Sequence, residues 1–137
     1  MKPSKRKLSA VKKAIVGIVT FAVLIFIFTL YFSRSYSDVA REELEAIRAE
    51  DASYAYTLTS KGFQEHVSLA DFQAYINQHP ILKDYTDLSF NEQKTENSVN
   101  YLHGVITGAD GSQQQVDFEL VKEGSEWKVQ NMQLSMP

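Results

Sequence analysis

The sequence predicts an α+β protein: one N-terminal transmembrane helix, then about three helices packed on a curved four-stranded antiparallel sheet. Three observations predict this fold class. A long uncharged apolar run lies near the N-terminus, helical periodicity continues as far as Pro80, and period-two alternation follows it. Helices followed by strands favour an arrangement in which the helices gather on one face of the sheet.

The apolar run Ala14–Phe32 contains no charged residue. As a helix it would be about 29 Å long, close to the hydrocarbon thickness of a bilayer. The remaining chain is too short to bury such a helix on all sides. We therefore predict a membrane span. A cleaved signal peptide is the alternative, with Ser33, Ser35 and Ser37 as small residues, but the run is long and lacks an A-x-A site.

Charge divides at this span and predicts its orientation. The 17 acidic residues all follow the span, whereas the segment before it carries only basic charges. These topology residues are Lys2, Lys5, Arg6, Lys7, Lys12 and Lys13. Because short basic tails stay on the cytoplasmic side, we expect residues 1–13 to be a cytoplasmic tail and 14–32 to cross a bacterial inner (plasma) membrane. Residues 33–137 would form a periplasmic or extracellular domain, whose acidity gives no basis for binding nucleic acid.

Small residues within the span suggest a contact with another membrane helix. Ala10, Ala14 and Gly17 lie near one helical face, where they would let a second helix approach closely. The expected partners are therefore the lipid bilayer and a membrane protein.

A first amphipathic helix is predicted over Ser37–Glu50, and the residues before it leave open whether it continues from the span. Ala40, Leu44 and Ile47 recur at i, i+4 and i+7 and form one apolar stripe. We expect the rest of this helix to be a solvated, charged surface. The acids of its first turns, which suit the positive end of the helix dipole, are Asp38, Glu42 and Glu43.

Two further helices are predicted before Pro80. One runs from Ala52 to about Ser60, is capped by Asp51 and is ended by Gly62. The other begins at the capping sequence Ser68-Leu69-Ala70-Asp71 and reaches about Gln78. The residue before a proline avoids the helical region, so Pro80 ends the last helix.

Four strands are predicted after Pro80. A short strand surrounds Leu88 and Phe90, and Val99–Thr107 forms a longer one that the Asp110-Gly111 hairpin signal joins to Gln115–Lys122. The turn Glu123-Gly124-Ser125 leads into the last strand.

In the last strand the alternation slips by one residue between Val129 and Met132, which indicates a bulge near Asn131. The expected core comprises Leu44, Ile47, Phe72, Ile76, Leu102, Ile106, Phe118 and Trp127.

Three segments resemble small domains of the nuclear transport factor 2-like, cystatin-like superfamily, specifically a bacterial membrane-anchored branch. They are AIRAEDASYAYTLTSKGFQ, SLADFQAYINQHPIL and GVITGADGSQQQVDFELVKEGSEWKV, between Ala46 and Leu134. A second resemblance, to membrane-anchored cytochrome oxidase assembly factors, is weakened by the helical stretch Ala52–Gln78. The superfamily holds enzymes, transport factors and secretion scaffolds, so its fold does not give a function.

The resemblance implies where an active site would lie. Enzymes of the superfamily use a cone-shaped pocket between sheet and helices, with an Asp or His base opposite a Tyr or an acid. The nearest match is Tyr101 and His103 on one strand face, with Asp117 on the neighbouring strand. Half-exposed structural residues are the simpler interpretation of this group.

No cofactor or metal site is predicted. The chain contains no cysteine, and its three histidines lack the spacing of a zinc site. His79 precedes Pro80 at a helix end, where the dipole favours a positive imidazole. We expect a membrane-anchored accessory or assembly protein of an envelope complex that acts by protein–protein binding and is not an enzyme. The alternative is a tethered ligand-binding or enzymatic domain using a cone pocket near Tyr101 and His103.

The predicted orientation is testable with a reporter enzyme that is active only outside the cytoplasm, fused after Pro137. The basic tail predicts full reporter activity in intact cells. Replacing the six basic residues by glutamine should lower that activity, because the retention signal is lost. An intact fusion protein without reporter activity, which means a reporter left in the cytoplasm, would contradict the predicted topology.

Overall fold

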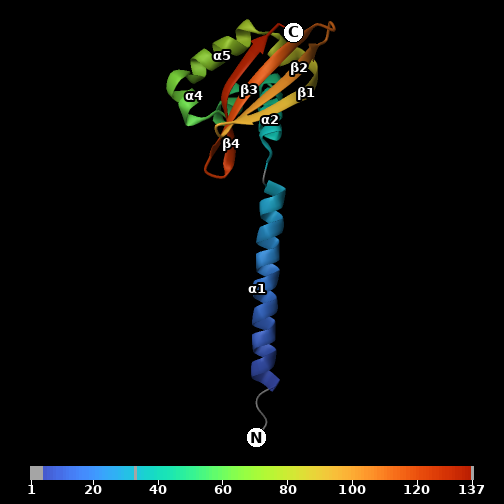
Figure 1. The fold of residues 1–137 in the computed structure, drawn as a ribbon, viewed down its shortest axis with the longest axis vertical. Coiled ribbons are helices and arrows are strands. Elements are labelled where there is room, and N and C mark those ends of the chain that lie inside the picture. Colours follow the sequence, from blue (N-terminus) through green and yellow to red (C-terminus); the bar gives the residue numbers. More distant parts are fainter. Residues whose placement is uncertain (1–4, 33, 137) are drawn as a thin grey trace. The chain divides into compact units, whose positions relative to one another are not determined.

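The computed structural model describes residues 5–32 and 34–136, and the side chains of residues 9–27 and 34–136. The chain divides into two compact units, residues 1–33 and 34–137, and the second is the predicted α+β domain (Figure 1). The helices are α1 (Lys5–Phe32), α2 (Tyr36–Arg48), α3 (Ala52–Thr57), α4 (Lys61–His66), α5 (Leu69–Gln78) and α6 (Ile81–Asp84). The strands are β1 (Tyr85–Glu96), β2 (Val99–Gly108), β3 (Gln113–Glu123) and β4 (Glu126–Ser135).

Helix α1 contains the apolar run. Its stretch Ser9–Ile27 has a mean hydropathy of 2.3, and none of it is buried against other parts of the chain. A membrane anchor or a signal sequence has this length and composition. The helix begins at Lys5, so most of the basic segment is helical and precedes the apolar run without a break.

Helix α2 begins with its own capping box. The Ser35 side chain accepts from the backbone N–H of Asp38, and the Asp38 carboxylate accepts from the backbone N–H of Ser35. Each group satisfies a donor that the first helical turn leaves free. This cap makes Tyr36 the first residue of a separate helix, one position earlier than predicted.

The helical region contains two short helices that the sequence analysis missed, α4 and α6. Gly62 was wrongly predicted to end the second helix and lies inside α4. Helix α3 ends at Thr57 because the next residues bond to β4: the Val129 N–H donates to the Leu58 carbonyl (2.9 Å), and the Ser60 N–H donates to the Val129 carbonyl (2.8 Å). Such pairing also covers an edge strand of the sheet.

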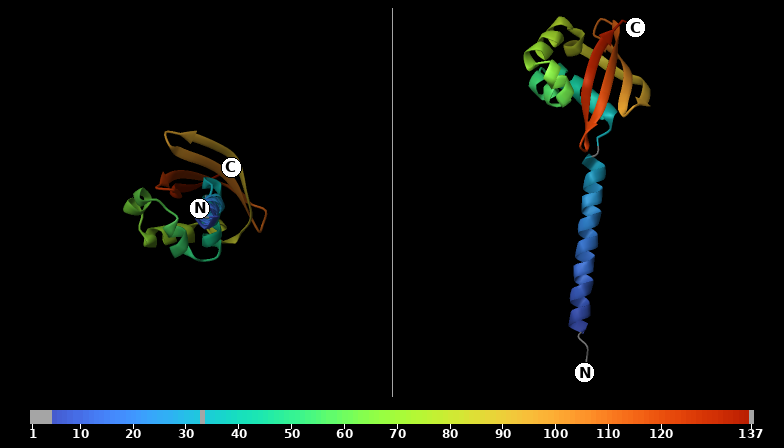
Figure 2. Two further views of the ribbon diagram at one scale, coloured as in Figure 1. Left: turned by 90° about the horizontal axis from the view of Figure 1, so that it is seen from below. Right: turned by 60° about the vertical axis from the view of Figure 1, so that its left-hand side comes forward.

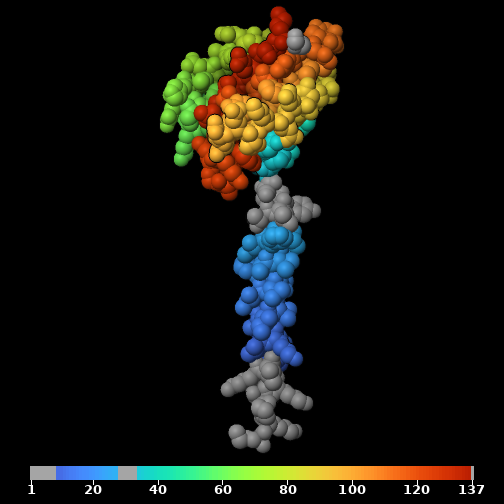
Figure 3. Space-filling model, viewed as in Figure 1, coloured from blue at the N-terminus to red at the C-terminus, as the bar shows by residue number. Residues whose placement is uncertain are grey.

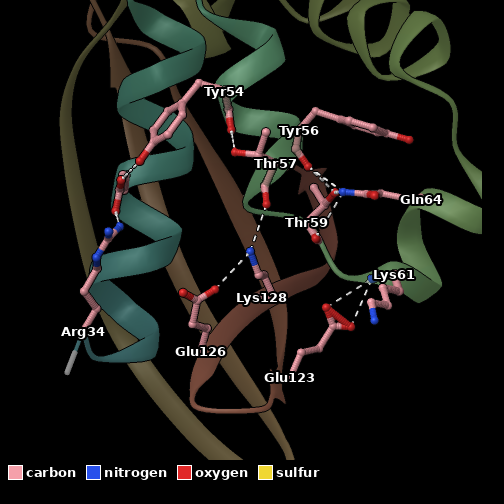
Figure 4. A network of polar contacts seen from close by, with 11 residues as sticks. Arg34, Tyr54, Tyr56, Thr57, Thr59, Lys61, Gln64, Glu123, Glu126 and Lys128 are labelled. Atoms are coloured by element: carbon pink, nitrogen blue, oxygen red, sulfur yellow. Dashed lines mark hydrogen bonds and ion pairs between the residues drawn. The ribbon is translucent and has the colours of Figure 1, made fainter. Parts of the chain in front are cut away.

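Side chains reinforce this junction between the helices and the β3–β4 hairpin (Figure 4). The Lys128 ammonium donates to the Thr57 carbonyl (3.0 Å), and the Lys61 N–H donates to the Glu123 carboxylate (3.1 and 3.3 Å). On the other side, Glu42 of α2 accepts from both Arg34 and Tyr54. These contacts hold α3 and α4 in place relative to the sheet.

The sheet is an antiparallel meander in the order β1-β2-β3-β4. It curves, and the helices of the domain lie on one side of it (Figure 2). The hairpin predicted at Asp110-Gly111 is present, with Gly111 at φ 81°. The predicted bulge near Asn131 is also confirmed, because the β3–β4 register shifts between Glu119 and Leu120.

Strand β1 is longer than the short strand predicted around Leu88 and Phe90. Its second half, Asn91–Glu96, is exposed and polar, so it carries no apolar alternation that sequence analysis could detect. Pairing with β2 and a tight turn at Asn97 and Ser98, both with positive φ, hold it in place.

The core fills the space between the helices and one face of the sheet. Seven of the eight predicted core residues are buried. Trp127 is the exception: it is half-buried, packs edge-to-face on Tyr36 (ring centroids 5.7 Å apart) and lies beneath the Lys122 ammonium. It is the second residue of β4, next to the turn that joins β3 and β4.

A substitution at Gly104 tests how closely β1 and β2 pack. A Cβ added there would lie 2.8 Å from Phe90 Cδ1 and 3.0 Å from the Ser89 carbonyl oxygen. We expect Gly104→Ala to lower the free energy of unfolding by about 1–3 kcal/mol, measured by denaturant titration of the full chain with Trp127 fluorescence.

Gly62→Ala is the matched control, because its Cβ would meet only the Gln130 side chain at 3.4 Å. Alanine within α4 should leave stability unchanged or raise it by about 0.5–1 kcal/mol. Equal midpoints for the two variants would show that the β1–β2 packing is not as described.

Candidate functional site: the open face of the sheet

The sheet has a face that no helix of the domain covers. Along β2 the side chains of Leu102 and Ile106 are fully buried towards the helices. The alternate residues Tyr101, His103 and Val105 are half-buried. Successive side chains of a strand point to opposite faces, so this second set lies on the face away from the helix layer. In the space-filling view, atoms of the four strands form a broad surface without helices over it (Figure 3). We call this surface the open face.

The structure brings two of the predicted site residues together on the open face. His103 and Asp117 are directly opposite in the β2–β3 ladder, and His103 Nδ1 lies 2.5 Å from Asp117 Oδ1. The Gln115 amide donates to the same oxygen (2.9 Å). With Nδ1 donating to the carboxylate, Nε2 of the neutral ring is an acceptor. Both side chains are about one-third exposed, at 34% and 33%, so the pair is accessible to a partner or ligand.

Tyr101 occupies the neighbouring cross-strand row, opposite Lys94 of β1 and Glu119 of β3. The strand register therefore aligns side chains in two rows across the sheet. One row consists of Glu92, His103, Asp117 and Gln133, and the next consists of Lys94, Tyr101, Glu119 and Asn131. The two rows together form a continuous surface of hydrogen-bonding side chains. A His–carboxylate pair can act as a general base, and here it lies on the face of the sheet away from the helices.

The other predicted residues lie elsewhere. Lys2 is outside the described residues, and Lys5, Arg6 and Lys7 begin α1. Lys12 and Lys13, together with Ala10, Ala14 and Gly17, are exposed on α1. His79 ends α5 as predicted, with Nδ1 2.8 Å from the Tyr75 carbonyl oxygen. Among the described residues, no group of three or more acidic, histidine or cysteine side chains is placed to hold a metal ion.

Sequence analysis missed one unusual residue, the buried Glu43 of α2. It was grouped with solvated acids, which is wrong: its side chain is 0% exposed, and neither carboxylate oxygen has a hydrogen-bond partner among the described atoms. Burial raises its pKa from 4.5 to about 8. The carboxyl group is therefore neutral at pH 7, when it can donate a hydrogen bond as well as accept one.

The signal for this burial was present in the helical spacing. Glu43 follows Ala40 by three residues and precedes Ile47 by four, so all three lie on one face of α2. Ala40 and Ile47 are 0% and 1% exposed. A charged residue inside an apolar stripe points to the core, and the position within the stripe outweighs the preference of acids for early helical turns.

Comparison with known proteins identifies the family of this chain. The model of a family described as a domain of unknown function (DUF4864) matches residues 33–137, and the chain belongs to that family. A search of curated proteins gave no match.

Two solved structures are similar to the α+β domain. One is described as a proposed NTF2-like transpeptidase from Campylobacter jejuni, with 11% identity and a TM-score of 0.52 over 72% of this chain and 99% of that chain. The other is a protein from Sphaerobacter thermophilus with 16% identity and a TM-score of 0.47, over 72% and 92% of the two chains. The first supports an NTF2-like fold and, at this identity, nothing about activity.

Buried Glu43 predicts how stability changes with pH. From pH 4.5 to about 8 the carboxyl is neutral in the folded chain and ionised in the unfolded chain, so the folded state binds the extra proton. The free energy of unfolding should therefore fall by about 1.4 kcal/mol per pH unit across this interval and level off above it.

Glu43→Gln removes the ionisation while keeping the shape of the side chain. Denaturant titrations from pH 5 to 9 should show a flatter profile for this variant and greater stability than the wild type at pH 8. Glu45→Gln, at an exposed position of the same helix, is the control and should keep the wild-type slope. A Glu43→Gln profile that parallels the wild type would contradict a neutral, buried carboxyl.

Proposed function

We propose that this protein is a single-pass, membrane-anchored accessory or assembly protein of a bacterial envelope complex. Its N-terminus lies in the cytoplasm and its α+β domain outside, as a membrane-anchored branch of the NTF2-like superfamily. It acts by binding other proteins. Within the bilayer α1 contacts a membrane protein, and outside the bilayer the open face binds a partner protein.

One observation carries the anchoring part of this proposal. The stretch Ser9–Ile27 is long enough to cross a bilayer, and its large apolar side chains are 44–69% exposed. Apolar surface of this extent is unfavourable in water and favourable in lipid. The two lysines just before Ala14, Lys12 and Lys13, support retention of the N-terminus in the cytoplasm.

Binding is favoured over catalysis because the interior of the domain is packed. The largest fully buried side chains include Phe118 from the sheet and Leu44, Ile47 and Leu82 from the helices, and they belong to one hydrophobic core. Within the described part of the domain, Tyr54 and Met136 are the exposed large apolar residues. A partner would therefore meet a polar surface, and weak or regulated association suits such a surface.

The open face is the surface we propose for this partner. Its side chains are held by the sheet in fixed cross-strand rows, so their ordering on binding has a low entropic cost. Tyr101 adds an amphipathic ring of the kind enriched at binding surfaces. Carboxylates of Glu92, Asp117 and Glu119 favour a partner with basic or hydrogen-bond-donating groups.

A tethered ligand-binding or enzymatic domain is the second candidate, favoured by the His103–Asp117 pair. Because both residues lie on the open face, such a function would use that face and not the packed interior. The two candidates thus share a location and differ in what binds there.

A photo-crosslinking amino acid placed at position 101 of the full chain tests the proposal in intact cells. We expect crosslinks to a membrane protein that mass spectrometry can identify. The same amino acid at position 54, an exposed tyrosine of α3, is the control and should give a different, weaker pattern. Absence of protein crosslinks at 101, with loss of cellular function in His103→Ala, would instead favour the ligand-binding or enzymatic candidate.

A further inference from the structure

The two edges of the sheet are not equally covered. The β4 edge is bonded to the helix layer, because the Val129 N–H donates to the Leu58 carbonyl (2.9 Å). Further along β4, the Leu134 N–H donates to the Tyr75 hydroxyl (3.2 Å). The other edge strand is β1. Among the described residues, its second half, Asn91–Glu96, forms no backbone hydrogen bond outside the ladder with β2. We call this segment the β1 edge, and it is free to pair with a further strand.

The turn between β1 and β2 determines which backbone groups of the β1 edge point outward. It has two residues, both with positive φ, and Glu96 pairs with Val99 across it. The pair that flanks such a turn is hydrogen-bonded, and along an antiparallel ladder hydrogen-bonded pairs alternate with pairs that exchange no bonds. Counting back from Glu96, the N–H and C=O groups of Gln93 and Thr95 therefore point away from β2.

The side chains of the β1 edge carry charges of alternating sign. Glu92, Lys94 and Glu96 are all exposed and, as alternate residues of one strand, share the open face. Lys94 lies 3.2 Å from Glu96, and its side chain remains 67% exposed. Glu92 has no salt-bridge partner among the described residues. An antiparallel strand that places an ammonium group opposite Glu92 would therefore complement this edge.

The charges restrict how the β1 edges of two copies could pair. Charged side chains usually protect a free edge, and a pairing centred on Lys94 would indeed place Lys94 opposite itself and Glu92 opposite Glu96 of the second copy. A pairing centred on Thr95 would run into the turn, whose positive φ values end the strand. A pairing centred on Gln93 places Lys94 opposite Glu92 of the second copy twice, once on each side of the two-fold axis.

We propose that two copies of this protein associate through their β1 edges, antiparallel and centred on Gln93. The outward backbone groups of Gln93 exchange hydrogen bonds with those of the second copy, and the two sheets become one continuous sheet. Glu92 belongs to the row of His103, and Lys94 to the row of Tyr101. Each row of the open face therefore continues into the other row of the second copy.

This interface is small. A bulge between Phe90 and Glu92 ends the regular part of the β1 edge, so only a few residues of each copy pair, and the dimer is weak in dilute solution. Confinement of both copies to one membrane, which rests on the proposed anchoring, raises their effective concentration. The pairing itself does not depend on the anchor or on the open-face partner, and the reporter fusion tests the orientation of the chain separately.

A single introduced cysteine detects the pairing, because the chain contains no cysteine of its own. Gln93→Cys places two thiols at the two-fold axis, where Cα atoms of hydrogen-bonded partners are about 5.5 Å apart. A short, membrane-permeant thiol-to-thiol crosslinker added to intact cells should give a covalent dimer of the full chain. Gln133→Cys, an exposed position on the β4 edge, is the matched control and should stay monomeric. Absence of the dimer at 93, or equal dimer at 93 and 133, would overturn the proposal.

Charge reversal tests the register in the Gln93→Cys background. Glu92→Lys and Lys94→Glu each place like charges opposite each other and should lower the crosslinked fraction about fivefold. The double variant with both changes restores opposite charges and should recover the crosslinking. Glu96→Lys is the control, because Glu96 lies opposite the uncharged Phe90 of the second copy in this register. A double variant that fails to recover, or a loss of crosslinking in Glu96→Lys as large as in Glu92→Lys, would contradict the proposed pairing.

Discussion

The packing of one face of α2 against the sheet is the interaction on which the rest of the domain depends. Ala40, Leu44 and Ile47 are buried there together with the inward side chains of β2, β3 and β4. Because α2 lies on one side, the sheet keeps a free surface on the other, and the outward residues of β2 and β3 form the open face. The same packing encloses Glu43, whose carboxyl is held neutral without any charged partner.

The two ends of α2 connect this packing to the neighbouring segments of the chain. At its start, the Ser35 capping box separates the domain from the apolar helix and lets each unit keep its own structure. At its end, Glu50 in the left-handed conformation turns the chain into α3. A single helix therefore organises the core and one boundary of the domain.

Much of this fold was predictable because the strongest signals are periodic. The stripe of α2, the alternation in β2 and β3 and the phase slip near Asn131 each follow from side-chain burial. The Asp110-Gly111 turn follows from the positive φ that glycine adopts easily. The second half of β1 was not predictable, since its side chains are polar and exposed and its sequence therefore carries no apolar alternation. The end of α3 was also not predictable, because it depends on bonds to Val129, about 70 residues later in the chain.

The site was predictable only in part. Strand alternation placed Leu102, Ile106 and Phe118 in the core and His103 beside Asp117 on the opposite face of the sheet, as observed. The resemblance instead implied a pocket between sheet and helices at Tyr101 and His103, whereas these side chains lie on the face away from the helices. Side-chain footprinting with hydroxyl radicals tests the central claim, that binding occurs on the open face, most directly. The account predicts that Tyr101 and His103 are protected in native membranes relative to the purified chain, while Tyr54 and His66 on the helix side react equally in both. Protection of Tyr54 and His66 with Tyr101 and His103 unchanged would contradict it.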